Sequence, residues 1–113
     1  MKRNGHIQRI KSIRKIAQRI AEKFDVERII LFGSYAHGKP KRYSDVDLLV
    51  VLNEKRRNWK ITWNIYRAIS PLPFSIDVVV RTKKELQERI PLGDWFLKDV
   101  TEQGIVVYES SRS

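Results

Sequence analysis

The segment Asp45–Leu52 places the strongest constraint on the fold, because it opens with two aspartates and continues as an unbroken apolar run. After Asp47 the chain reads Leu-Leu-Val-Val-Leu. A strand carries apolar side chains at successive positions when both of its faces are covered by other parts of the protein. We therefore expect a sheet with this strand in its middle and with helices packed against it.

The rest of the chain alternates between helical and extended patterns. Residues 6–24 place apolar side chains at steps of three and four with Lys and Arg between them, which predicts an amphipathic helix. Thr82 and Glu85 have the spacing of a capping box, and Asp94 and Gly104 are suited to open and close a short helix. The expected strands are 26–32, 45–52, 74–80 and 105–108, and the expected helices are 6–24, 58–69, 82–89 and one between Asp94 and Gly104. This order predicts an α+β (α/β) fold with a mixed β-sheet and helices packed against it.

The length of 113 residues fits a single domain over 1–113. We expect it to consist of the N-terminal amphipathic helix 6–24, a core over 26–80, and C-terminal helices and a strand over 82–108. We find neither an apolar run near 18 residues nor a signal peptide, so we expect a cytoplasmic location and no contact with membranes.

The net charge of +10, from 23 Lys and Arg against 13 Asp and Glu, indicates an anionic partner. Such a surface attracts nucleic acid, triphosphates or an acidic protein face. Charge alone does not choose among them, and for nucleic acid there is no support beyond charge.

Three aspartates predict a metal site. Asp45 and Asp47 are two residues apart in a strand, so they point to the same face with Cα atoms about 6.5 Å apart. Asp77 interrupts an otherwise apolar strand, and a neighbouring position beside the first two would bring facing Cβ atoms to about 5 Å. Carboxylates this close repel one another unless divalent cations neutralise them. With no cysteine and two histidines in the chain, oxygen-ligated Mg²⁺ or Mn²⁺ is favoured over zinc.

Gly33 and Ser34 follow the strand 26–32 and predict a phosphate-binding turn. Glycine lets the backbone turn sharply and approach a ligand, and the exposed amides and the Ser34 hydroxyl can donate to phosphate oxygens. A helical turn that begins near residue 34 would favour an anion further.

The sequence GSYAHG over 33–38, followed after five residues by SDVDLLV over 44–50, resembles the minimal nucleotidyltransferases of the DNA polymerase beta superfamily. The resemblance runs from about Val26 to Val80. It implies that 26–80 is a catalytic core that transfers a nucleoside monophosphate, AMP from ATP, to an acceptor. It also implies that Asp45, Asp47 and Asp77 are catalytic and ligate two Mg²⁺ ions, with Mn²⁺ as a substitute. Gly33 and Ser34 would hold the β- and γ-phosphates.

His37 departs from the family pattern, which commonly has arginine at this position. Neutral imidazole is a weaker triphosphate ligand than guanidinium. Either His37 binds the nucleotide together with a basic residue of the following loop, or activity is reduced or lost. The basic residues that could substitute are Lys39, Lys41 and Arg42.

Short members of this family act as antitoxins, and the resemblance implies a HEPN ribonuclease toxin as partner and acceptor. Two alternatives stay open: a catalytically weak or inactive antitoxin that neutralises its partner by binding, and a basic nucleic-acid-binding module. Trp59, Trp63 and Tyr66 share one face of the helix 58–69, where we favour packing in the core over contact with a partner.

Overall fold

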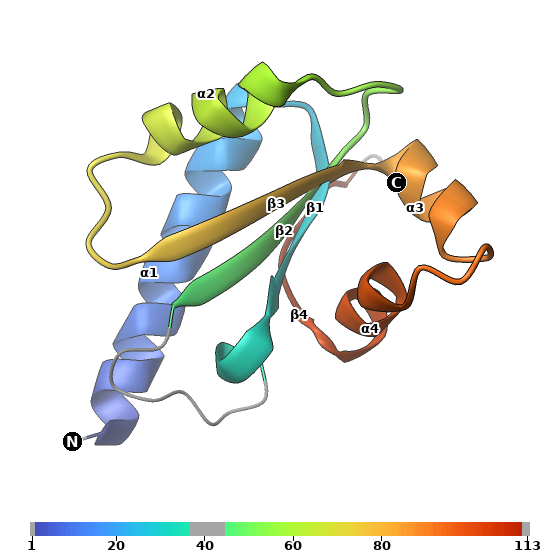
Figure 1. The fold of residues 1–113 in the computed structure, drawn as a ribbon. Coiled ribbons are helices and arrows are strands. Elements are labelled where there is room, and N and C mark those ends of the chain that lie inside the picture. The colour runs from blue at the N-terminus through green and yellow to red at the C-terminus, as the bar shows by residue number, and fades with distance from the viewer. Residues whose placement is uncertain (1, 37–44, 112–113) are drawn as a thin grey trace.

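The computed structural model describes residues 2–36 and 45–111, with side chains from residue 9 onward (Figure 1). Its elements follow the predicted order of helices and strands. They are α1 (Lys2–Lys23), β1 (Val26–Phe32), the 3₁₀ turn η1 (Gly33–Tyr35), β2 (Val46–Leu52), α2 (Trp59–Ile69), β3 (Ile76–Thr82), α3 (Lys83–Arg89), α4 (Trp95–Gln103) and β4 (Ile105–Glu109).

Two elements differ from the prediction by more than one residue, and the other boundaries agree to within one residue. The first helix begins at Lys2 and not at residue 6. The third strand covers Ile76–Thr82, two residues later than 74–80. The later start follows from the pairing, because β3 enters the sheet where β2 does, with Ile76 opposite Val46.

The four strands form one mixed sheet in the order β3-β2-β1-β4. β1 pairs antiparallel with β2 and with β4, while β2 and β3 run parallel. β2 is an inner strand and is buried at every position except Asp47. The prediction of a mixed sheet with a doubly covered strand is therefore confirmed.

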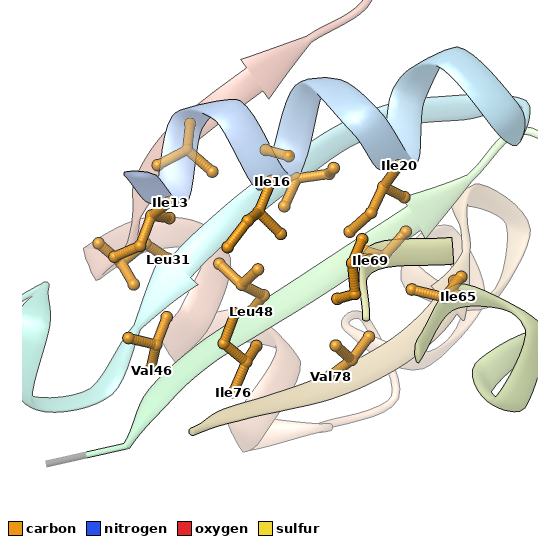
Figure 2. Close-up of a cluster of buried hydrophobic side chains, with 14 of the residues drawn as sticks. Ile13, Ile16, Ile20, Leu31, Val46, Leu48, Ile65, Ile69, Ile76 and Val78 are labelled. Carbon is orange, nitrogen blue, oxygen red and sulfur yellow. The ribbon is translucent and has the colours of Figure 1, made fainter. Parts of the chain in front are cut away.

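Helices α1 and α2 cover one face of the sheet (Figure 2). In α1 the buried side chains follow helical spacing while every Lys and Arg from residue 11 to residue 23 faces solvent, which confirms the predicted amphipathic helix. The main contacts on this face are made by Ile13, Ile16 and Ile20 of α1, Ile65 and Ile69 of α2, and Leu31, Leu48 and Val78 of the strands. None of the helices in residues 2–36 and 45–111 has both the length and the apolar composition needed to cross a bilayer.

The opposite face is covered by α3 and α4 (Figure 1). The predicted caps of these helices are confirmed, with a complete capping box at Thr82 and Glu85 and with Asp94 as the N-cap of α4. A smaller cluster joins Leu97 and Val100 of α4 to Ile30, Leu49 and Val51 of the sheet. The smaller helices leave the β2 and β3 ends that carry the aspartates uncovered, since Asp45 and Asp77 are exposed.

The prediction that the aromatic side chains of α2 pack in the core is wrong for its two tryptophans. Trp59 is 76% exposed and Trp63 is 62% exposed. The buried side of α2 is set by Ile65 and Ile69, and the two tryptophans lie on another side of the helix. Tyr66 is partly buried as expected, and its hydroxyl accepts a hydrogen bond from the Val78 amide at 2.7 Å.

Candidate functional site

The site is organised around Asp47, the second residue of β2. Asp47 lies opposite Phe32 of β1 and opposite Asp77 of β3. In-register residues of neighbouring strands point to the same face and have Cα atoms about 5 Å apart. The two carboxylates, which are 30 residues apart in the sequence, are therefore neighbours on the face that α3 and α4 cover only in part.

Asp45 lies directly before β2 and is exposed, as is Asp77, whereas Asp47 is partly buried. Burial raises the pKa of Asp47, and the negative charges of Asp77 and Asp45 raise this pKa further. The three carboxylates thus share one electrostatic environment, as expected from their spacing.

This group of carboxylates suits hard divalent cations in chemical character. Among the residues that the structure describes, no Lys, Arg or His forms an ion pair with any of the three. The same residues contain no set of three Asp, Glu or His side chains already close enough to enclose one ion. Because Asp45 and Asp77 are exposed, their side chains can turn toward Asp47 around a cation. The crowding of like charge and the all-oxygen donors fit Mg²⁺.

Gly33 is in direct contact with the Asp47 side chain. Its φ of 78° lies in the left-handed region, which side chains other than glycine rarely adopt. A Cβ at this position would collide with Oδ2 of Asp47. Two separate reasons therefore require glycine at position 33: the left-handed backbone conformation of the turn and the close approach of the Asp47 carboxylate.

The turn after β1 is helical, as predicted, but is limited in the described residues to the 3₁₀ turn η1 and Ala36, whose amide donates to the Gly33 carbonyl at 3.1 Å. Ser34 lies in this turn and is partly buried. Tyr35 is buried, and its hydroxyl accepts a hydrogen bond from Nη1 of Arg9 at 2.8 Å. Arg9 also stacks over the Phe74 ring. The contact fixes η1 against α1 and was not foreseen, because nothing in the sequence pairs positions 9 and 35.

A small pocket lies beside Gly33, between η1 and α4. The Phe32 and Phe96 rings meet edge to face on its apolar side, with centroids 5.5 Å apart. Asp99 and Gln103 of α4 supply polar groups to the pocket. Sequence analysis did not predict it, since α4 was recognised only as a helix and not as a neighbour of the turn.

The remaining predicted nucleotide-binding residues, His37, Lys39 and Arg42, lie outside the described residues. The structure thus brings Asp45, Asp47, Asp77 and Gly33 together, with Ser34 next in the turn.

Comparison with known proteins matches residues 13–108 to the family model described as nucleotidyltransferase domain. Two proteins of Methanocaldococcus jannaschii, both named "Putative protein adenylyltransferase", are similar over shorter stretches. One is 54% identical over 44 residues, which is 35% of this chain and 30% of the relative. The other is 40% identical over 42 residues, which is 37% of this chain and 49% of the relative. The matches thus span less than half the length of these relatives.

Two solved structures share the fold. A crystal structure described as a putative nucleotidyltransferase from Sulfolobus solfataricus has a TM-score of 0.69 and 19% identity, over 97% of this chain and 88% of the other. A crystal structure described as a toxin-antitoxin with AMP-PNP has a TM-score of 0.61 and 24% identity, over 87% of this chain and 73% of the other. At these identities the likeness concerns the fold.

Proposed function

The chain belongs to the nucleotidyltransferase domain family, and we propose that it transfers AMP from ATP to a hydroxyl of an acceptor protein. The observation that carries the proposal is the placement of Asp47, which faces Asp77 across the parallel pair β2–β3 and touches Gly33. A group of carboxylates beside a glycine turn combines a place for cations with a place for phosphate.

In this proposal Asp45, Asp47 and Asp77 hold two Mg²⁺ ions, with Mn²⁺ as a substitute. Bound cations would neutralise the carboxylates and the triphosphate and polarise the acceptor oxygen. The raised pKa of Asp47 supports this role, because burial and then the charges of Asp77 and Asp45 disfavour the ionised carboxylate, and a bound cation would offset both effects.

Gly33 and Ser34 bind the β- and γ-phosphates. Lys39 and Arg42 add positive charge to the same end of the nucleotide, and His37 contributes a neutral hydrogen-bonding group. The acceptor oxygen forms a bond to the α-phosphorus while the bond from that phosphorus to the bridging oxygen of the β-phosphate breaks. Pyrophosphate leaves, and Asp77 takes up the acceptor proton. Positioning and charge neutralisation supply most of the rate enhancement.

The acceptor in this proposal is a HEPN toxin, and the chain is the antitoxin of the pair. The names of the Methanocaldococcus relatives support a protein acceptor. The toxin-antitoxin structure with AMP-PNP supports the pairing and ATP as donor. Exposed Trp59 and Trp63 support a partner interface, since tryptophan is enriched where proteins bind one another.

The test uses labelled ATP, Mg²⁺ and a candidate HEPN partner protein. Wild-type protein should label that partner, and a double variant with Asp45→Asn and Asp47→Asn should not. Asp25→Asn, at an exposed aspartate beyond the other end of β1, is the matched control and should label the partner normally. Labelling that survives the double variant would contradict the proposal.

His37 favours a second candidate, in which the antitoxin neutralises its partner by binding and chemistry is weak or absent. The same double variant separates the two, because it would still neutralise the toxin in a binding mechanism. A basic nucleic-acid-binding module would instead bind RNA with a steep salt dependence that ignores both aspartates.

A further inference from the structure

Arg81 lies on the same strand and the same face as Asp77. In β3 the residues Ile76, Val78 and Val80 pack toward α1 and α2, while Val79 packs against the cluster below α3 and α4. Strand alternation therefore puts Asp77, Val79 and Arg81 on one face. Four residues of strand separate the Cα atoms of Asp77 and Arg81 by about 13 Å.

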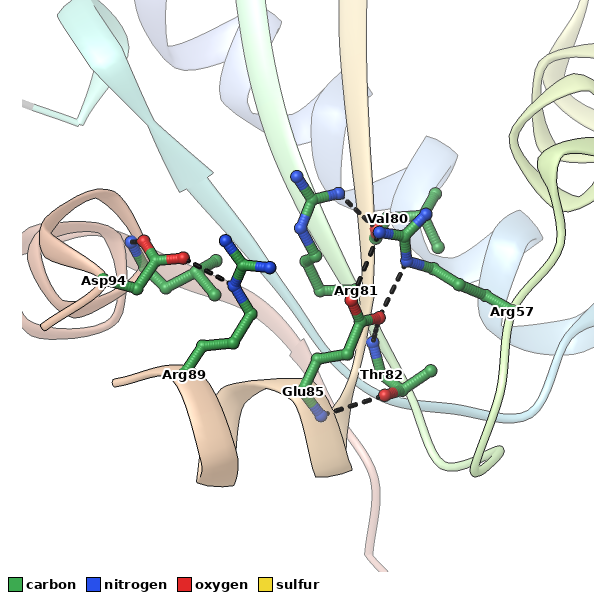
Figure 3. A network of polar contacts seen from close by, with 8 residues as sticks. Arg57, Val80, Arg81, Thr82, Glu85, Arg89 and Asp94 are labelled. Carbon is green, nitrogen blue, oxygen red and sulfur yellow. Dashed lines mark hydrogen bonds and ion pairs between the residues drawn. The ribbon is translucent and has the colours of Figure 1, made fainter. Parts of the chain in front are cut away.

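Among the residues that the structure describes, the Arg81 guanidinium uses one of its five N–H groups in a hydrogen bond, from Nη1 to the carbonyl of Val80 at 2.7 Å. Most of its donors thus have no partner in this part of the chain. Within residues 9–36 and 45–111 no carboxylate forms an ion pair with it. Figure 3 shows this guanidinium extending away from α3.

The acidic side chains near Arg81 are already engaged by other arginines (Figure 3). Arg57 binds Glu85 through Nε at 2.7 Å and Nη2 at 3.2 Å. Arg89 binds Asp94 through Nε at 2.8 Å. Three arginines against two carboxylates leave one positive charge without a counterion in this cluster, and that charge is on Arg81.

The cluster does not favour the Arg81 charge. Burial lowers the pKa of Arg81, and the neighbouring Arg57 and Arg89 lower it further, against the opposing effect of Glu85 and Asp94. The positive charge is thus disfavoured by its immediate surroundings. A ligand that brings a negative charge would favour it.

We propose that Arg81 binds a carboxylate of the acceptor protein and thereby positions the acceptor hydroxyl at the carboxylate site. The inference rests on the proposed transfer to a protein. In the sheet order β3-β2-β1, Gly33 lies at the β1 side of Asp47 and Arg81 lies on β3. The triphosphate and the anchored group of the acceptor thus occupy opposite sides of Asp47.

A single carboxylate fits this face better than a nucleic acid does. The planar fork of arginine matches a carboxylate with two parallel hydrogen bonds. A phosphate backbone would have to pass Glu85 and Asp94 beside Arg81 as well as the aspartates at the strand end, and it would be repelled by each. One acidic side chain at Arg81 also approaches Glu85 and Asp94, each of which is paired with another arginine, but it does not extend along the aspartates at the strand end.

Synthetic peptides with one tyrosine and one glutamate test the proposal. A separation of about four residues in an extended peptide spans the distance between Asp77 and Arg81. We expect wild-type protein with ATP and Mg²⁺ to label this peptide roughly tenfold more efficiently than a peptide with glutamine in place of glutamate. Arg81→Gln should remove the preference while the affinity for ATP stays unchanged, and Arg81→Lys should retain part of it.

Arg67→Gln is the matched control, since Arg67 is an exposed arginine of α2, on the other side of the sheet. It should keep the preference for glutamate. Arg81→Gln should melt no lower than wild type, because it removes a disfavoured charge. The inference about Arg81 would be overturned if the preference for glutamate persisted in Arg81→Gln, or if wild-type protein bound ATP without favouring the glutamate peptide. Either result would leave the proposed function standing. Labelling of an RNA oligonucleotide that depends on Arg81 would also overturn the inference. Wild-type protein that neither binds ATP nor labels any peptide would defeat the proposed function itself.

Discussion

Asp47→Asn is expected to stabilise the fold when divalent cations are absent. Asp47 is partly buried and stands in register with Asp77, with Asp45 two residues before it. The substitution keeps the size and shape of the side chain and removes one negative charge from the group. It therefore relieves both the repulsion and the cost of burying a charged carboxylate.

The size of the effect follows from the spacing of the strands. Two unit charges about 5 Å apart repel by roughly 0.8 kcal/mol in a medium like water and by about 3.3 kcal/mol at an effective dielectric constant near 20. Asp77 is exposed, so solvent screens the pair and the lower figure is closer. With the smaller contribution of Asp45, we expect a gain of about 1 kcal/mol, which is a rise of roughly 4 °C in Tm for a domain of this size.

The gain depends on pH in a defined direction. The pKa of Asp47 is raised above its ordinary value of 3.8. Between that value and the folded pKa, the folded state therefore holds a proton that the unfolded state has released. The Asp47 carboxyl therefore contributes to the free energy of unfolding of wild type below pH 3.8, and this contribution is lost as the pH rises through the folded pKa. The amide that Asp47→Asn introduces does not titrate, so the advantage of the variant should be absent in acid and complete near pH 7.

Thermal melts in EDTA at low salt, taken from about pH 3 to pH 8, measure this difference. Salt should reduce it by screening, and Mg²⁺ should raise the Tm of wild type more than that of the variant. A variant that melts below wild type near pH 7 without divalent cations would refute the reasoning, as would a difference that does not change with pH.

Four further substitutions test the local geometry. Gly33→Ala should lower stability and abolish ATP binding because its Cβ would collide with Asp47, whereas Gly93→Ala, also at positive φ but with open space around it, should cost about 1 kcal/mol and leave ATP binding intact. Gly104→Ala should lower the free energy of unfolding by about 1–3 kcal/mol in urea titrations, since a Cβ there would meet the Ile30 side chain and two backbone carbonyls. Thr82→Ala should cost about 1–2 kcal/mol, because it removes the buried cap of α3, with no loss of AMP transfer.

The features that the sequence predicted best are those with local causes. The apolar run after Asp47 requires cover on both faces wherever the strand lies, and β2 has that cover. The caps at Thr82 and Asp94 are satisfied by backbone amides three residues away, so spacing alone identifies them. The register of Asp47 with Asp77 was anticipated because a carboxylate in an apolar strand needs a special environment.

The features that sequence analysis missed depend on contacts between distant elements. The spacing of Trp59 and Trp63 suits a buried helical stripe, but α1 and β3 bury the side of α2 that carries Ile65 and Ile69. Arg81 looks like an ordinary strand-end cation until the structure shows that its acidic neighbours are bound to other arginines. Such pairings follow from which helix lies where, and the periodicity of a single segment does not contain that information.

The unequal cover of the sheet explains why the site lies where it does. The long helix α1 and the apolar side of α2 cover one face along β2 and β3, from Val46 and Ile76 onward. On the other face, α3 and α4 reach Leu49 and Val79 but not the start of the two strands. Charged side chains at that start remain within reach of water and of ligands, while the strands beneath them are fixed by the core on the covered face. The fold can thus hold mutually repelling carboxylates in register without burying them fully, which is the condition that the proposed cation-dependent transfer requires.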